Sequence, residues 1–396
     1  MQVISLIHYR NNLSSGKDSK MVTGSQELIR GMNTQLVLDM IIFKGPISRA
    51  TIAANLGLTK ATVSAIVQIL IAKSLVLEVG SKDTKKGRRP IMLELNRECG
   101  YIISLDLSLE YITVLTANLV GENCSLKRYP NHASREAILS KISQVLADSI
   151  ANAPDSQYGV VGVSLAIHGV VHDNKVVFLP YSPYDGIDFA AHLEDVFKLP
   201  VLVENEANLS ALGEWAYSFH KDNLLNISIH SGIGLGIVMN NRLLSGQDGY
   251  AGEFGHTIVE VDGRECPCGN FGCLEQYASE RILLKELSSI KNEKINAETF
   301  ALLYRKKDPD AIHTMDLFIK YIAVGINNLL HTFNPDTIVI NSSFTMYFPE
   351  VCETITKRLH NTMRKYCRLV PSKLQDTSIL LGGVYLCSRK FLELSE

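Results

Sequence analysis

Two breaks in a helical pattern divide residues 34–80 into three short blocks, which restricts how the first hundred residues can fold. Apolar residues recur at helical spacing in each block, and the breaks fall at Gly45-Pro46 and at Gly57. Ser48 and Thr59 each precede one of the later blocks, and both are good helix N-caps. The pattern predicts three helices with a tight turn at Gly57, which is the helix-turn-helix arrangement.

In that arrangement the third helix enters the major groove of DNA. The start of this block carries small polar and cationic side chains, which suit contacts to base edges and phosphates. An arginine at the start of the second helix could contact the DNA backbone. The candidate DNA-binding residues of the two helices are Ser48, Arg49, Thr59, Lys60, Thr62 and Ser64.

The segments "LVLEVG" and "RRPIMLELN" predict two strands that flank the charged loop "SKDTKKGRRP", and such a hairpin is a wing. Arg88 and Arg89 lie at its base, before Pro90. Arginines held extended by a following proline suit a narrow minor groove, where the potential is most negative. The alternative is a purely structural module whose Lys and Arg residues only keep it soluble.

The charge is distributed unevenly along the 396 residues, although the formal net charge is only −2. Residues 1–95 hold 13 Lys and Arg against 6 Asp and Glu, and residues 96–396 hold 26 against 35. A basic front (+7) on an acidic body (−9) suggests a polyanionic partner for the front alone. No apolar run approaches the roughly 18–20 residues of a membrane helix, and no signal peptide is recognisable, so we expect a cytoplasmic protein.

From Tyr101 onward the pattern changes to apolar strands mixed with long helices. Strands are predicted at "YIISLDLSLEYITVLTANLVG", "GVVGVSLAI", "PVLVEN", "LLNISIH", "GLGIVMN" and "DTIVIN", and helices around residues 134–151, 207–218, 279–304 and 312–333. Such a mixture indicates an α/β body of two lobes.

The stretch "CPCGNFGC" places three cysteines within eight positions. The other five cysteines are scattered, which argues against a disulfide framework. Together with a histidine upstream, the spacing His256-x9-Cys266-x-Cys268-x4-Cys273 supplies one imidazole and three thiolates, a set that matches a closed tetrahedral zinc site. Four protein ligands leave no position for a reactive water, so we expect a structural Zn²⁺; the alternative is a set of reduced thiols without metal.

The stretch "ENEANLSALGE" and residues 231–279, with "GEFGH" and "CPCGNFGCLEQ", closely resemble the ROK family of repressors, open-reading-frame proteins and sugar kinases. "GPISRATIAANLGLTKATVSAIV" with "GRRP" is similar to the front of the transcriptional repressor branch, the xylose-repressor type especially. The resemblance spans about residues 33–396. It implies an actin-like and hexokinase-like body behind the winged helix-turn-helix, with two lobes closing on a sugar.

The resemblance also places the sugar contacts. Asn205 and Glu206 would hold one side of the ring, and Glu253, His256 and Glu275 the other. Sequence alone supports part of this, because Asn205 and Glu206 end an apolar strand, where α/β folds bind ligands. Glu206 and Glu253 could otherwise be solvated loop carboxylates, and Glu275 could merely orient a neighbouring ligand. His256 could give one ring nitrogen to zinc and the other to the sugar.

Three departures from the kinase members of the family argue against phosphoryl transfer. Where the kinases have a D-x-G-G-T-type turn, this sequence has Asp106-Leu107-Ser108-Leu109-Glu110, whose last two residues would crowd and repel a triphosphate. Where they have a Gly-Gly pair under adenosine, it has Asn341, Ser342 and Ser343. Glu206 replaces their catalytic Asp. The glycine-rich "SGIGLGIVMN" is interpreted as a tight hairpin and not as a phosphate loop.

A further departure concerns the loop "FLPYSPYDGIDF", in which Tyr181 or Ser182 stands where many members carry Asn. The identity of the sugar therefore stays open, with xylose suggested only by the resemblance.

We therefore expect a sugar-responsive repressor that binds a palindromic operator as a homodimer, or as a homotetramer, and that needs no ATP. One alternative is an ATP-dependent sugar kinase with a DNA-binding module. Another is an activator, or a DNA-binding protein that ignores sugars. The expected domains are an arm (1–31), the winged helix-turn-helix (32–96), a smaller lobe (97–207 plus 385–396) and a larger lobe (208–384).

Overall fold

The computed structural model describes residues 26–81, 90–179 and 182–394, and these form two compact units. Unit 1 comprises the described residues up to Gly100, the short segment Ser156–Tyr158 and the described residues from Arg389 onward. Unit 2 comprises Tyr101–Asp155 and Gly159–Ser388. Within the described residues, no helix is long and apolar enough to cross a membrane.

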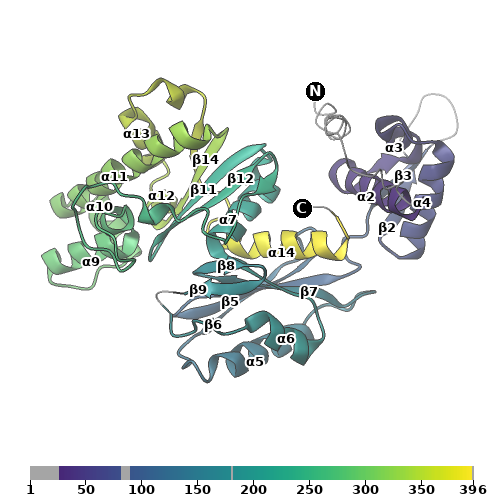
Figure 1. Cartoon of the computed structure of the whole chain (residues 1–396), viewed down its shortest axis with the longest axis horizontal. Coiled ribbons are helices and arrows are strands. Elements are labelled where there is room, and N and C mark those ends of the chain that lie inside the picture. The colour runs from purple at the N-terminus through teal and green to yellow at the C-terminus, as the bar shows by residue number, and fades with distance from the viewer. Residues whose placement is uncertain (1–25, 82–89, 180–181, 395–396) are drawn as a thin grey trace, which may run out of the picture. The chain divides into compact units, whose positions relative to one another are not determined.

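Unit 1 contains three helices and a small antiparallel sheet of order β1-β3-β2 (Figure 1). The helices are α2 (Gln26–Lys44), α3 (Arg49–Leu56) and α4 (Lys60–Ala72), and the strands are β1 (Ile47–Ser48), β2 (Val76–Ser81) and β3 (Ile91–Leu95). The predicted breaks lie where expected, since α2 ends before Gly45-Pro46 and α3 ends before Gly57.

Side chains and backbone geometry at the α3–α4 junction explain these boundaries. Ser48 Oγ accepts a hydrogen bond from the Thr51 backbone N–H, and Thr59 Oγ1 accepts one from Thr62. Both are N-cap bonds. Gly57 has φ of 66°, in the left-handed region that glycine adopts without strain. Because the turn is so short, α4 follows α3 almost directly.

The end of the chain divides differently from the predicted lobes. Residues 385–396 were predicted to lie in the smaller lobe, whereas the residues from Arg389 onward pack within unit 1. Arg389 Nη1 lies 3.5 Å from Asp39 Oδ1, and Gln35 Nε2 donates to the backbone carbonyl of Glu393. Tyr158 adds an edge-on contact with the ring of Phe391. These contacts tie the last residues to α2 and to the short 156–158 segment.

Unit 2 is built on two five-stranded sheets, of which the first has the order β10-β7-β4-β5-β6. Its strands are β4 (Tyr101–Leu107), β5 (Tyr111–Asn118), β6 (Ser125–Pro130), β7 (Val160–Ile167) and β10 (Val201–Asn205). The hairpin β8 (Val170–His172) and β9 (Lys175–Phe178) follows β7, and α5 (Ile138–Ala151) and α6 (Phe189–Phe197) cover one face of the sheet (Figure 1). Strands β4, β7 and β10 run parallel, so their carboxyl ends share one edge.

The second sheet has the order β13-β12-β11-β14-β15, and long helices cover its outer face (Figure 1). Its strands are β11 (Asn223–Ile229), β12 (Ile233–Met239), β13 (Arg242–Leu243), β14 (Thr337–Ser342) and β15 (Arg368–Pro371). The helices of this lobe are α8 (Glu275–Ala278), α9 (Glu280–Lys291), α10 (Ala297–Arg305), α11 (Pro309–Phe333), α12 (Ser343–Tyr347) and α13 (Val351–Arg358), with short 3₁₀ turns η2 (Phe254–His256) and η3 (Thr362–Lys365).

Two helices, α7 (Glu206–Glu214, continued by the π-turn η1 at Trp215–Phe219) and α14 (Thr377–Phe391), pack closely in the middle of unit 2. Glycine makes this approach possible. A Cβ at Gly382 of α14 would collide with the Leu209 carbonyl, and one at Gly213 of α7 would collide with the Ser378 carbonyl. The two lobes therefore meet at this pair of helices, whose backbones pack with almost no side chain between them.

The predicted body elements are present with one correction. The segment 279–304, predicted as a single helix, forms two helices, α9 and α10. Asn292 caps α9 with φ of 55°, and Asn296 begins α10 by accepting from Thr299 N–H. Asparagine tolerates the left-handed conformation and caps helices with its side chain, so the apolar periodicity alone concealed this turn.

Candidate functional site

The first cluster of polar residues lies at the carboxyl ends of three neighbouring parallel strands. Ile167, the last residue of β7, pairs with Leu107 of β4 on one side and with Asn205 of β10 on the other. Asp106 and Glu206 flank these pairs in sequence, and His168 follows Ile167 directly. Strand ends of this kind are where open α/β sheets bind ligands.

Asp106 and His168 form a direct pair, with Asp106 Oδ1 at 2.8 Å from His168 Nε2. Burial of His168 disfavours its charged form, but the charge of Asp106, the hydrogen bond to it and the charge of Glu206 outweigh burial and raise the pKa of His168 to about 9. The His168 side chain is 33% exposed and that of Asp106 is 18% exposed, so a ligand could reach both.

Glu206 begins α7 and carries an unsatisfied acceptor. Its Oε2 atom is buried and has no hydrogen-bond partner among the residues that the structure describes. Burial raises the pKa of Glu206, His168 and His230 oppose that shift, and Asp106 adds to it. A buried carboxylate oxygen without a donor is costly, so a ligand that donates a hydrogen bond there would be stabilised.

Asn205, the neighbouring predicted sugar contact, is largely committed to the fold. Its Oδ1 accepts from the backbone N–H groups of Ala207 and Asn208, and its Nδ2 donates to the Gly169 carbonyl. It is thus the N-cap of α7 and links β10 to the β7–β8 turn. One amide hydrogen remains for a ligand.

The remaining predicted contacts come from η2 and α8. His256 Nε2 lies 3.7 Å from Glu253 Oε2, and His256 Nδ1 lies 3.9 Å from Glu275 Oε1. Burial raises the pKa of Glu253, an effect that His256 opposes and that the carboxylates of Glu275 and Glu206 reinforce. Glu206 and Glu275 are therefore close enough to Glu253 for their charges to act on it.

The glycine-rich turn between β11 and β12 lies against two of these carboxylates. A Cβ at Gly234 would come within 3.4 Å of Glu206 Oε1, and one at Gly232 within 3.2 Å of Glu275 Oε2. At Gly236 a Cβ would collide with the Ala207 carbonyl. The glycines therefore allow a tight hairpin to pack on α7 and beside the carboxylates.

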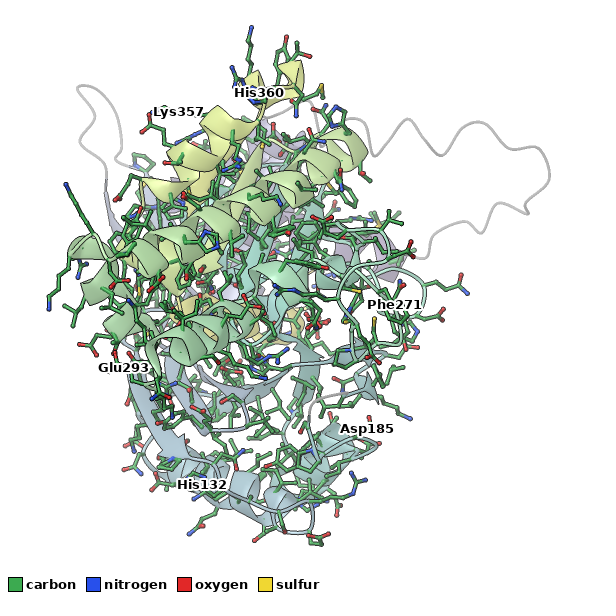
Figure 2. The ribbon with its side chains drawn as sticks, turned by 90° about the vertical axis from the view of Figure 1, so that its left-hand side faces the viewer. His132, Asp185, Phe271, Glu293, Lys357 and His360 are labelled. Carbon is green, nitrogen blue, oxygen red and sulfur yellow. The ribbon has the colours of Figure 1, made fainter. Side chains whose placement is uncertain are left out.

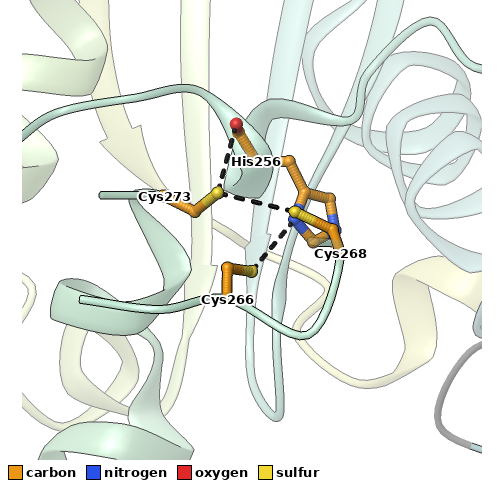
Figure 3. Close-up of side chains that lie close together, drawn as sticks. All are labelled: His256, Cys266, Cys268 and Cys273. Carbon is orange, nitrogen blue, oxygen red and sulfur yellow. Dashed lines mark hydrogen bonds between the residues drawn. The ribbon is translucent and has the colours of Figure 1, made fainter. Parts of the chain in front are cut away.

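His256, Cys266, Cys268 and Cys273 form a second cluster, in which all four candidate ligand atoms lie within 4.8 Å of one another (Figure 3). Cys266 Sγ is 3.6 Å from His256 Nδ1, and Cys268 Sγ is 3.7 Å from Cys273 Sγ. The β-bridge between Ile258 and Cys273 holds the loop closed.

These spacings fit a tetrahedral metal. Zinc–sulfur bonds of about 2.3 Å and zinc–nitrogen bonds of about 2.05 Å put two sulfurs about 3.8 Å apart and a sulfur and a nitrogen about 3.6 Å apart. Burial, followed by the neighbouring thiols, raises the pKa of Cys273, so thiolates here need compensating positive charge. The sequence-predicted set of four could therefore hold a metal ion.

Two buried side chains lie next to the four candidate metal ligands. Glu275 is 3% exposed, and its Oε1 lies 3.4 Å from Cys266 Sγ. Gln276 Nε2 donates to that same carboxylate oxygen and lies 3.5 Å from Cys266 Sγ. Glu275 thus belongs to both clusters, with one oxygen toward the cysteines and the other toward Gly232.

Comparison with known proteins assigns this architecture. The model of the family described as "ROK family" matches residues 102–390. The chain belongs to the ROK family. Among curated ROK relatives, the xylose repressor of Bacillus subtilis is 33% identical over 383 residues, which cover 94% of this chain and 99% of that protein. The N-acetylglucosamine repressor of Escherichia coli is 27% identical over 390 residues, covering 93% and 95%.

Solved ROK structures agree. A ROK family transcriptional regulator, described as a homologue of the E. coli MLC protein, superposes with a TM-score of 0.79 at 25% identity, covering 92% of this chain and 97% of that one. A ROK glucokinase from Streptomyces griseus, solved with glucose and AMPPNP, gives a TM-score of 0.65 at 25% identity and covers 72% of this chain and 99% of its own. The latter match is shorter by about the length of unit 1.

Several of the positions that were predicted to differ from the ROK kinases make contacts within the protein. In the β4–β5 turn, Leu109 is 51% exposed, and the backbone carbonyl of Glu110 accepts from Asn131. Asn341 Nδ2 donates to Ser378 Oγ and the Gln375 carbonyl.

A second internal contact closes the end of β14. Glu280 Oε1 accepts both the Ser342 hydroxyl at 2.7 Å and the Ser343 backbone N–H at 2.6 Å. The chain's own carboxylate therefore holds the donors at the start of α12.

The predicted DNA-binding residues differ in their surroundings. Lys60 and Thr59 are exposed at the start of α4, with Thr62 and Ser64 half-buried behind them. Ser48 is buried and caps α3, and Arg49 forms a 2.5 Å ion pair with Glu78 of β2. Arg88, Arg89 and Tyr181 lie outside the described residues.

His168 and its pairing with Asp106 were not predicted from the sequence. A usable signal existed, because "VSLAIH" ends β7 just as "VLVEN" ends β10. Asp106 drew attention only as part of an altered turn. Applying the strand-end argument to all three parallel strands would have brought these residues together.

Proposed function

We propose that this chain is a sugar-responsive transcriptional repressor, with xylose as the first candidate inducer. The observation that carries the proposal is the 33% identity to the B. subtilis xylose repressor across 94% of this chain, which extends into unit 1. Several further xylose repressors, including that of Staphylococcus xylosus at 33% identity, align over similar shares of the chain.

Unit 1 is the proposed winged helix-turn-helix domain. Helix α3, the Gly57 turn and α4 have the order and length of such a motif, and β2 and β3 form an antiparallel hairpin behind it. Lys60 is exposed at the N-terminus of α4, where recognition helices meet the major groove. Thr59, Thr62 and Ser64 complete the proposed face, and Arg88 and Arg89 are proposed contacts to the minor groove.

Arg49 has a narrower role in this proposal. Its ion pair with Glu78 joins α3 to the wing, so it would approach the DNA backbone only from within that pair.

Operator binding as a homodimer, with each protomer reading half of a palindrome, is the usual solution for this motif.

The sugar is proposed to bind among Glu206, Glu253, His256 and Glu275. Sugar hydroxyls both donate and accept, and the carboxylates of this set supply acceptors, of which Glu206 Oε2 is buried without a hydrogen-bond partner among the described residues. Asn205 would contribute its single remaining amide hydrogen. A structural Zn²⁺ on His256 Nδ1 and the three cysteines would fix the ring so that Nε2 faces the ligand.

Phosphoryl transfer is not part of the proposal. Phosphates need donors and positive charge, whereas the donors at the start of α12 already serve Glu280. Asp106 is engaged with His168, and Glu110 adds negative charge at the turn.

Regulation requires that the sugar favour the arrangement that does not bind DNA, because a ligand with equal affinity for both arrangements shifts nothing.

The proposal is tested with an operator duplex selected from random palindromes by the full chain. D-xylose is expected to release the protein from that duplex, with no sugar-dependent formation of ADP from ATP. Turnover of ATP at ordinary kinase rates with any pentose or hexose would instead favour a sugar kinase that carries a DNA-binding module. Tight operator binding that no sugar changes would contradict the sugar-responsive part.

A further inference from the structure

The Asp106–His168 pair has no role in the binding scheme above, although it occupies the middle of the ligand-binding edge. His168 follows β7, which lies between β4 and β10 in the sheet. Asp106 is on one side of it and Glu206 on the other. The three side chains therefore come from three adjacent strand ends, where a ligand would meet all of them.

The pairing orients the imidazole. Nε2 of His168 is taken by Asp106 Oδ1 at 2.8 Å. For the part of the chain that the structure describes, the Nδ1 atom of His168 makes no hydrogen bond. A carboxylate at this distance favours the imidazolium form, in which Nδ1 also carries a proton and is a charged donor.

The neighbouring acceptor is Glu206, whose Oε2 is buried without a donor. Its charge acts on His168, and that of His168 acts on it. A charged donor thus stands beside an unsatisfied acceptor. A hydroxyl group matches this combination because it accepts one hydrogen bond and donates another.

We propose that His168, held by Asp106, is a ligand-contacting residue that donates from Nδ1 to a sugar hydroxyl, which in turn donates to Glu206. The inference deepens the proposed function and rests on it. It also specifies the ligand class as an uncharged polyhydroxy compound. Four carboxylates, Asp106, Glu206, Glu253 and Glu275, would repel a phosphate more strongly than one imidazolium could attract it.

The mechanism makes ligand affinity depend on pH in a defined direction. Binding needs the protonated His168, so affinity is retained at neutral pH and falls as the pH rises through about 9. The charged groups facing His168 are Asp106 of β4 and Glu206 of α7, and His230 after β11 faces Glu206 from the other side. Replacing Asp106 with Asn removes the main charge that favours the imidazolium.

The test measures sugar binding to the full-length chain by calorimetry between pH 6 and pH 10. The ligands are D-xylose, D-glucose and N-acetyl-D-glucosamine, with xylose 5-phosphate as the charged comparison. Variants His168→Gln and Asp106→Asn are compared with wild type. His172→Gln is the matched control, because His172 has its own acidic neighbour, Asp173, at 3.4 Å on the β8–β9 hairpin.

The wild type and His172→Gln should bind one neutral sugar with constant affinity up to about pH 8, and should weaken about tenfold by pH 10. His168→Gln should bind about tenfold or more weakly at pH 7, without that high-pH decline. Asp106→Asn should bind about tenfold or more weakly than the wild type at pH 8, and this loss should shrink as the pH falls to 6, which a mere loss of folding would not produce.

Wild-type affinity and pH profile in His168→Gln would overturn this inference while leaving the sugar site intact. Tighter binding of xylose 5-phosphate than of D-xylose would overturn the assigned ligand class. A wild type that binds no sugar at any pH would overturn the proposed function itself, and this inference with it.

Discussion

The Nδ1 atom of His256 lies 3.6 Å from the Sγ atom of Cys266, the separation expected for two ligands of one tetrahedral zinc ion. The other ring nitrogen faces Glu253. A metal bound at this place would therefore fix the tautomer of a histidine that also lines the proposed sugar site. In the proposed function, this one ring would link ligand binding to the integrity of the cysteine loop.

We predict that the purified chain contains one zinc ion and that Cys268→Ser loses it. Losing a thiolate removes part of the stabilisation that the metal gives the loop, so the unfolding midpoint should fall by about 5 °C or more. Elemental analysis and calorimetry measure both effects. Cys124→Ser, at an exposed cysteine far along the chain from the cluster, should change neither. Wild-type protein that folds fully without metal would contradict the assignment.

Lys60 and Lys73 lie at opposite ends of α4 and test the orientation of this helix on DNA. Lys60→Ala should weaken operator binding by about fivefold to tenfold and lower the salt slope by about one, because a phosphate contact is lost. Lys73→Ala should leave both unchanged. Fluorescence anisotropy with the selected operator at several salt concentrations measures them. Equal effects of the two substitutions would mean that α4 does not meet DNA by its N-terminus.

The close packing of α7 and α14 predicts opposite outcomes for one substitution at two glycines. Gly382→Ala should destabilise the protein by about 1–3 kcal/mol, because its Cβ would collide with the Leu209 carbonyl. Gly31→Ala, in an open stretch of α2, should stabilise its helix by about 0.5–1 kcal/mol. Denaturant unfolding compares them, and a neutral Gly382→Ala would show that the helices can separate freely.

Local signals were sufficient to predict much of this structure. The caps at Ser48 and Thr59 and the glycine at position 57 are sequence-adjacent features, so they located α3 and α4 correctly. The four candidate metal ligands also lie within 18 consecutive residues, and the structure gathers them. Short-range patterns of this kind predict local geometry without information about distant residues.

Features that depend on distant partners could not be predicted in the same way. The pairing of Asp106 with His168 spans 62 positions and follows from the order of parallel strands, which no local pattern encodes. The hydrogen bond from Asn205 Nδ2 to the Gly169 carbonyl, and the ion pair of Arg49 with Glu78, likewise depend on neighbours in the fold. The residues from Arg389 onward contact Asp39, Gln35 and Tyr158, all of them distant in the sequence.

The central claim is that a sugar bound at Glu206 releases the protein from its operator. The most direct measurement is operator affinity with and without D-xylose for the wild type, Glu206→Gln and Glu293→Gln, a control at an exposed glutamate on the surface of the same unit (Figure 2). The sugar should weaken operator binding by about tenfold or more in the wild type and in Glu293→Gln. Glu206→Gln should bind the operator normally and stay bound when the sugar is added. Release of Glu206→Gln at wild-type sugar concentrations would contradict the account.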